Sequence, residues 1–183
     1  MPRKLMRSNK PLVGLVILGF LFLLALPASQ QSASRHKSAG KVEHVTDGDT
    51  VSIRPVDGGK PYRCRLYGID APETGKPDRP GQLYGGEATK ALNKLIGGKT
   101  VEILLTGEDT YNREVCIIYL NGADINLKMI KLGYAWAYRK FLKSEHSRNY
   151  IAAETAAKRK KLGLWRQKNP MRPDKFKRLY WNN

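Results

Sequence analysis

Four carboxylates and one arginine lie in two short segments of the chain, residues 47–50 and 65–74. The first segment reads Asp-Gly-Asp-Thr, and the second runs from an arginine through an aspartate to a glutamate. Clustered carboxylates repel one another unless a cation or a base neutralises them. Their hard oxygen atoms favour calcium or magnesium over zinc. The histidines of the chain do not have the spacing of zinc ligands: His36, His44 and His146.

Each half of this pattern also has an ordinary explanation. An isolated Asp-Gly-Asp sequence is usually a turn, and an arginine on a strand usually points into solvent. The combination indicates a site, because acids are scarce in this chain. There are 33 Lys and Arg residues against 16 Asp and Glu, which gives a net charge of +17. A basic field of this kind attracts nucleic acid, anionic lipid or acidic glycans, and charge alone does not choose among them.

The first 28 residues are expected to lie outside the fold. Residues 1–10 are basic, residues 11–27 carry no charge, and a small, polar stretch follows. That order is typical of a secretory signal peptide. The apolar run is slightly short for a membrane span. A cleaved signal and an uncleaved anchor that tethers the protein through residues 11–27 both remain open, and either predicts export. Residues 29–40 are interpreted as a flexible linker.

Two cysteines, Cys64 and Cys116, remain in the exported part. Export makes a disulfide chemically possible. Spacing does not show that the two residues meet, so the alternative is two separate small buried side chains.

Hydrophobic periodicity and turn residues predict a small barrel. Apolar residues flank the Asp47–Thr50 turn, Asp57–Pro61 is a hairpin signal, and residues 74–86 are interpreted as a long surface loop. Five short strands and three helices suit an α+β fold with a five-stranded barrel of the OB type. The later strands and the helices are expected at residues 62–69, 100–105 and 115–120, and at residues 87–96, 124–132 and 144–162. The tail, residues 167–183, is expected to be irregular and basic.

Five sequence blocks resemble the staphylococcal nuclease (thermonuclease) family, in the order found there. The resemblance covers about residues 41–166. The block that ends in Pro-Glu-Thr is specific, and the others corroborate it: residues 47–51, 65–74, 109–113, 133–138 and 163–165. The resemblance implies a nuclease domain that uses Ca²⁺ to hydrolyse phosphodiester bonds in DNA and RNA with little sequence specificity. It also implies products that end in 3′-phosphate.

The resemblance assigns metal ligands to this chain. Asp49 and Asp70 would bind Ca²⁺ directly, and the backbone carbonyl of Ala71 would be a third ligand. Asp47 would hold metal-bound water. Water and a substrate phosphate oxygen would complete the coordination.

Catalytic and substrate-binding roles follow from the same resemblance. Glu73 would position or deprotonate the attacking water, while Arg65 and Arg113 would grip the phosphate. Tyr111 and Tyr138 would contact the nucleotide, although simple aromatic packing explains each of them equally well.

The third block departs from the family pattern at three positions. Asn112 replaces a glycine, Thr110 replaces a residue that is often basic, and Glu114 directly follows Arg113. Asn tolerates a positive φ better than most residues, so the turn can survive. These changes are expected to affect rate and substrate grip.

Two other functional classes are consistent with parts of the sequence. One is a non-catalytic OB-fold module that binds nucleic acid, and the other is a surface-anchored binder of anionic lipid or cell-wall polymer. The tail could clamp nucleic acid or a membrane surface, or it could cover the barrel. Its bases alternate with aromatic residues: Arg172, Lys175, Lys177 and Arg178 with Phe176, Tyr180 and Trp181. A monomer is the default expectation, because no oligomerisation signal was identified.

Overall fold

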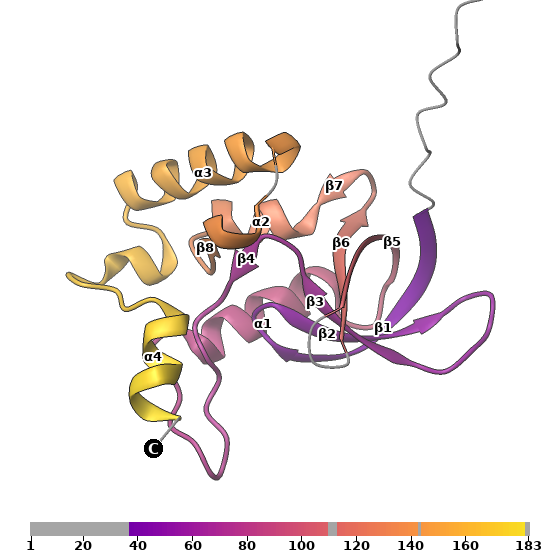
Figure 1. The fold of residues 1–183 in the computed structure, drawn as a ribbon, viewed down its shortest axis with the longest axis horizontal. Helices are drawn as coiled ribbons and strands as arrows, with labels where there is room; N and C mark the ends of the chain where they lie inside the picture. Colours follow the sequence, from indigo (N-terminus) through magenta and orange to yellow (C-terminus); the bar gives the residue numbers. More distant parts are fainter. Residues whose placement is uncertain (1–36, 110–112, 143, 182–183) are drawn as a thin grey trace, which may run out of the picture. The chain divides into compact units, whose positions relative to one another are not determined.

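The computed structural model describes residues 37–109, 113–142 and 144–181 (Figure 1). These residues belong to one compact unit, Ser34–Asn183. The proposed signal segment lies outside the described residues, and so do Thr110, Tyr111 and Asn112. Among the helices of the described ranges, none is both long enough and apolar enough to cross a membrane.

Five strands form a closed barrel, as predicted. Neighbouring strands follow the order β3-β2-β1-β5-β6, and a parallel pairing of β3 with β6 closes the ring. The other pairings within the ring are antiparallel. The strands are β1 (Lys37–Asp47), β2 (Thr50–Pro55), β3 (Tyr62–Leu66), β5 (Thr100–Asp109) and β6 (Glu114–Leu120). The short β7 (Ala123–Asp124) extends the sheet beyond β6, and β4 (Ile69–Asp70) pairs separately with β8 (Trp136–Ala137).

The three predicted helices are present, with ends that differ by three residues or fewer. They are α1 (Gly85–Ile96), α2 (Ile125–Lys131) and α3 (Ser144–Arg159). Asp124 caps α2 as expected, because its carboxylate accepts a hydrogen bond from the Leu127 N–H at 2.8 Å. Two short 3₁₀ helices, η1 (Arg139–Phe141) and η2 (Gly163–Arg166), complete the part of the chain before the tail.

The expectation of an irregular tail was wrong. Residues Pro173–Tyr180 form a fourth helix, α4. Pro173 occupies the first turn, where a missing N–H costs nothing. Phe176 is buried, and its ring packs against Tyr180 one turn later at 4.7 Å between centroids. The helix is too short to be stable alone, so its contacts with the rest of the protein determine its formation.

The end of the expected linker also has regular structure. Residues 37–40 are the first part of β1 and pair with β5. At Gly40, a Cβ atom would lie 2.4 Å from Ile53 Cγ2, so a glycine is needed where the strands pack. In the sequence, Gly40 was interpreted as part of a flexible linker, because small residues are common in linkers. In the structure it allows two strands of the barrel to pack closely.

A buried asparagine fastens α2 to the seam where β3 meets β6. The Asn126 side chain donates to the carbonyl oxygens of Tyr67 at 3.1 Å and Cys116 at 3.0 Å, and it accepts from the Ile118 N–H at 3.1 Å. Because a buried amide costs stability unless its hydrogen bonds are made, this arrangement specifies how α2 sits on the barrel.

Cys64 and Cys116 form a disulfide across the same seam, which decides between the two alternatives left by the sequence. Their Cα atoms are 6.1 Å apart, although the residues are 52 positions apart in the chain. Both side chains are fully buried. The bridge therefore ties β3, the strand of Arg65, to β6.

We expect reduction of this disulfide to lower the free energy of unfolding by about 2–4 kcal/mol, because the cross-link restricts the unfolded chain. Urea unfolding with and without reductant measures the difference. A Cys64→Ala/Cys116→Ala variant is the control, since its unfolding midpoint should not respond to reductant. Free thiols in the denatured, unreduced protein would contradict the assignment.

Candidate active site

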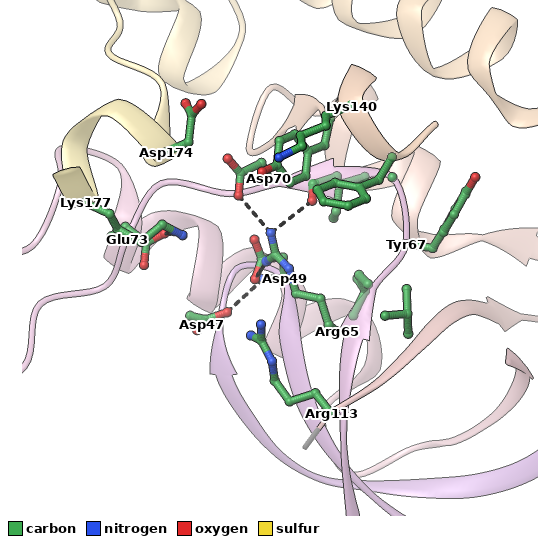
Figure 2. Close-up of a pocket in the computed structure, with 16 residues that line it drawn as sticks. Asp47, Asp49, Arg65, Tyr67, Asp70, Glu73, Arg113, Lys140, Asp174 and Lys177 are labelled. Carbon is green, nitrogen blue, oxygen red and sulfur yellow. Dashed lines mark hydrogen bonds and ion pairs between the residues drawn. The ribbon is translucent and has the colours of Figure 1, made fainter. Parts of the chain in front are cut away.

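A pocket of about 340 Å³ gathers residues from six parts of the chain (Figure 2). Its walls come from the β1–β2 turn, β3, β4 and the residues after it, the start of β6, the segment around η1, and α4. Seven side chains expected at the site line this pocket: Asp47, Asp49, Arg65, Asp70, Glu73, Arg113 and Tyr138. The fold thus brings together acids and arginines from distant positions of the sequence.

Arg65 lies between the two acids expected to bind metal. Its Nη1 forms an ion pair with Asp49 Oδ1, and its Nη2 lies 2.8 Å from Asp70 Oδ1. The same Nη2 donates to the Ile69 carbonyl at 3.2 Å. The Asp49 and Asp70 side chains are only 6% and 3% exposed. Two buried carboxylates therefore converge on one cationic group.

The strand register explains why Arg65 reaches Asp49. Arg65 pairs with Thr50 across β2 and β3, and the Leu66 N–H donates to the Asp49 carbonyl at 2.8 Å. Gly48 makes the turn possible, because a Cβ atom there would lie 2.7 Å from the Cβ atoms of both Ala71 and Ala88. The tight turn lets α1 pack close behind the pocket.

Hydrogen bonds fix the Asp49 carboxylate. Its Oδ2 accepts from the Ala71 N–H at 2.8 Å, and its Oδ1 accepts from the Thr50 hydroxyl at 3.1 Å. The Asp47 carboxylate accepts from the Asp49 N–H at 3.2 Å. Asp47 is therefore adjacent to Asp49, but it is less buried. Ala71 is buried, and its backbone lies directly against Asp49.

The small β4–β8 sheet and the residue after it bring Asp70 and Tyr138 into the lining of the pocket. Asp70 pairs with Trp136, and the Tyr138 N–H donates to the Gly68 carbonyl at 2.8 Å. Glu154 of α3 supports β8 from behind, since its buried carboxylate accepts from the Ala137 N–H at 3.3 Å. Tyr138 packs edge to face on Phe141 at 4.9 Å between centroids. Its side chain is half-buried and lines the pocket.

Burial dominates the electrostatics of the acids. Burial raises the pKa of Asp70, and the Arg65 guanidinium opposes that rise. The pKa of Glu73 is also raised by burial, and the ammonium group of Lys177, 2.7 Å from Glu73 Oε1, opposes it. Burial and the nearby Arg65 lower the pKa of Arg113, although a guanidinium stays charged at neutral pH. The pocket holds acids that are costly to ionise without a cation.

Sequence reasoning missed several members of the pocket, among them Lys140, Asp174 and Lys177. Asp174 and Lys177 come from α4, which was expected to be irregular. The alternation of bases with aromatic residues in the tail was a signal that this segment has a role, but it did not indicate a contact with Glu73. Tyr111, the other expected nucleotide contact, lies outside the described residues.

The donor set suits a hard cation. In the described residues, no group of three or more His, Cys, Asp and Glu side chains is arranged to hold a metal ion. The expected calcium site needs only two carboxylates, one carbonyl and oxygen atoms from water and substrate. Asp49 and Asp70 line the same pocket and contact the same guanidinium through its two terminal nitrogens. Their chemistry therefore fits calcium, provided that Arg65 gives up its contacts with both.

The sequence is similar to those of proteins named as nucleases. A family model described as "Staphylococcal nuclease homologue" matches residues 63–167. An "Uncharacterized endonuclease" of Haemophilus influenzae is 34% identical over 156 residues, which cover 85% of this chain and 82% of that protein. "Probable endonuclease LCL3" of Komagataella phaffii is 32% identical over 170 residues, which cover 77% of this chain and 75% of that protein. "Staphylococcal-like nuclease CAN1" of Arabidopsis thaliana is 39% identical over 114 residues, and the match covers only 32% of that longer protein.

We expect Asp70→Asn to stabilise the protein in the presence of a chelator. The folded chain holds the Asp70 proton to a higher pH than the unfolded chain, so its contribution to stability falls as the pH rises from 3.8 through the raised pKa. The ionised carboxylate is therefore less favourable in the folded chain than the neutral one. Asp70→Asn cannot ionise, so it should raise the free energy of unfolding and Tm at pH values above that pKa.

Thermal unfolding at several pH values measures this effect, with the exposed Asp57→Asn as the matched control. The gain should shrink toward acid pH, where Asp70 in the parent is itself protonated. A lower Tm for Asp70→Asn at neutral pH would mean that the ion pair with Arg65 outweighs the cost of burial.

Proposed function

The chain belongs to the staphylococcal nuclease family, and on that basis we propose that it is a calcium-dependent nuclease that hydrolyses phosphodiester bonds of DNA and RNA with little sequence specificity. One observation carries the proposal: Arg65 joins Asp49 and Asp70 in a pocket that also holds Glu73 and Arg113. The names of the relatives support a nuclease function.

Asp49, Asp70 and the carbonyl of Ala71 are the residues that would hold calcium, with Asp47 orienting a bound water. When bound, calcium would act as a Lewis acid and stabilise negative charge on the phosphate. Arg65 then no longer has to neutralise both acids, so its planar guanidinium is available to a phosphate oxygen. Arg113 enters the same pocket from the start of β6 and would bind the phosphate from another direction.

Hydrolysis requires a water molecule in line with the bond that breaks. Glu73 would orient this water and take its proton as the water oxygen bonds to phosphorus. The bond from phosphorus to the 5′-oxygen then breaks, and that oxygen takes a proton from solvent, which leaves a 3′-phosphate end. Arg65 and Arg113 stabilise the oxygens of the five-coordinate phosphorus, where negative charge grows.

The acids of the pocket argue against the two alternative classes. A module that only binds nucleic acid or anionic lipid gains nothing from buried carboxylates, because they repel a polyanion. Asp49, Asp70 and Glu73 all line the pocket, and the pKa values of Asp70 and Glu73 are raised by burial. Such a cost is useful where a cation and a reacting water must be held.

We also propose that the protein acts outside the cytoplasm, either free after removal of residues 1–28 or tethered through residues 11–27. The basic and apolar order of these residues supports export. The Cys64–Cys116 disulfide is also consistent with an oxidising compartment. Mass measurement of the N-terminus in membrane and soluble fractions of the host distinguishes a cleaved signal from an anchor.

The function is tested by digestion of plasmid DNA and of RNA with residues 35–183. We expect cutting with Ca²⁺ and none with chelator or with Mg²⁺ alone. Glu73→Gln and Arg113→Ala should each lower the rate by about a hundredfold or more, because each removes a group that acts in the transition state. End-group analysis of the products should find 3′-phosphate.

Each outcome has a distinct meaning. Retardation of DNA on a gel, with no cleavage under any condition, would support the non-catalytic binding module. Cleavage that is equally fast in both variants would show that the catalytic site lies elsewhere. Cleavage with Mg²⁺ alone would retain the nuclease and refute the calcium requirement.

Tyr138 is expected to bind substrate rather than to take part in the reaction. Tyr138→Ala should raise KM several-fold with little change in kcat, because base stacking contributes about 1–3 kcal/mol to binding. Phe141→Ala is a useful comparison, since it removes the ring that packs against Tyr138. A fall in kcat at constant KM would assign Tyr138 a role in the transition state.

A further inference from the structure

The C-terminal helix packs against the loop that carries Glu73 (Figure 1). The Trp181 indole N–H donates to the Pro80 carbonyl at 3.1 Å, and the Gln82 amide donates to the Met171 carbonyl at 2.5 Å. Arg79 also lies over the Trp181 ring at 5.4 Å from its centroid. The family match ends at residue 167, so α4 is an addition to the part of the chain that the family model covers.

One face of α4 lines the pocket. Asp174 and Lys177 are one helical turn apart and both line it, whereas Lys175 and Arg178 are exposed. Lys177 Nζ lies 2.7 Å from Glu73 Oε1, and the Glu73 side chain is only 12% exposed (Figure 2). The helix thus places the Lys177 ammonium group next to Glu73, the carboxylate that would orient the attacking water.

Glu73 needs such a partner, because the loop does not hold its side chain by itself. Glu73 lies outside regular secondary structure, between β4 and α1. Its backbone is fastened, since its N–H donates to the Gln82 side chain at 3.3 Å and its carbonyl accepts from the Gln82 N–H at 2.8 Å. These bonds fix the main chain of Glu73 but not its side chain, which has several rotatable bonds. The ion pair with Lys177 restricts the side chain.

We propose that Lys177 is a positioning residue that holds the Glu73 carboxylate in the orientation needed to align the attacking water, which makes α4 part of the active site. The proposal rests on the proposed nuclease function. Misplacement of a catalytic group by about 1 Å costs on the order of a hundredfold in rate, so an ion pair that fixes one carboxylate can matter greatly. A lysine that instead bound substrate phosphate would act on affinity.

Steady-state kinetics of Lys177 variants separate these roles. Lys177→Ala should lower kcat by about tenfold or more and leave KM within about twofold, while Lys177→Arg should keep most of kcat. Lys177→Gln retains most of the side-chain stem and should behave like Lys177→Ala, which guards against a packing defect. Lys175→Ala is the matched control, since it removes the same charge from an exposed position of the same helix. Thermal unfolding of each variant verifies that it is folded.

A double-mutant cycle with Glu73→Gln decides whether Lys177 acts through Glu73. If it does, Lys177→Ala should change the rate of the Glu73→Gln protein by less than about twofold. Additive losses, an unchanged kcat, or a rise in KM alone would overturn the proposal. So would an equal loss of kcat in Lys175→Ala, because the effect would then be one of total charge. A parent that cuts with neither Ca²⁺ nor Mg²⁺ would refute the proposed function itself, and the positioning role with it.

Discussion

Asp49 and Asp70 are almost completely buried, and both bind the guanidinium of Arg65. Two carboxylates in such a place cannot both ionise without a positive partner. The surrounding structure follows from this constraint. The β2–β3 register aligns Arg65 with the β1–β2 turn, Gly48 permits that turn to approach Ala71 and α1, and the β4–β8 pair presents Asp70. Arg65 therefore supplies the positive partner that both buried acids require.

Burial of these acids lowers the stability of the fold unless each acid has a positive partner. Burial raises the pKa values of Asp70 and Glu73, and each acid is partly compensated by one base, Arg65 or Lys177. Lys177 comes from a distant segment, whereas Arg65 lies in the strand before Asp70 and reaches Asp49 across the β2–β3 pairing. The acids therefore depend on tertiary contacts for their charge balance, and the same contacts fix their positions.

Much of this arrangement could be predicted from the sequence. Alternating apolar residues and turn signals located the five strands. The acid and arginine blocks identified six of the nine charged residues that line the pocket, and they left out Lys140, Asp174 and Lys177. The missing parts share one physical cause, which is that contacts between distant segments decide them. Local sequence does not specify an eight-residue helix that depends on Phe176 for burial, and it does not show that Lys177 meets Glu73. The pairing of Cys64 with Cys116 depends in the same way on the closure of the barrel.

The β3–β6 pairing that closes the barrel also brings two arginines of the pocket together. β3 and β6 are distant in the sequence, and their pairing places Arg65 next to Val115, close to Arg113. Pairing of segments so far apart in the chain is costly, because the loop entropy is lost before the contacts form. A chain with an open seam has its two arginines apart, whatever secondary structure it has already gained. The arrangement that brings the two arginines together thus exists only where the barrel is closed.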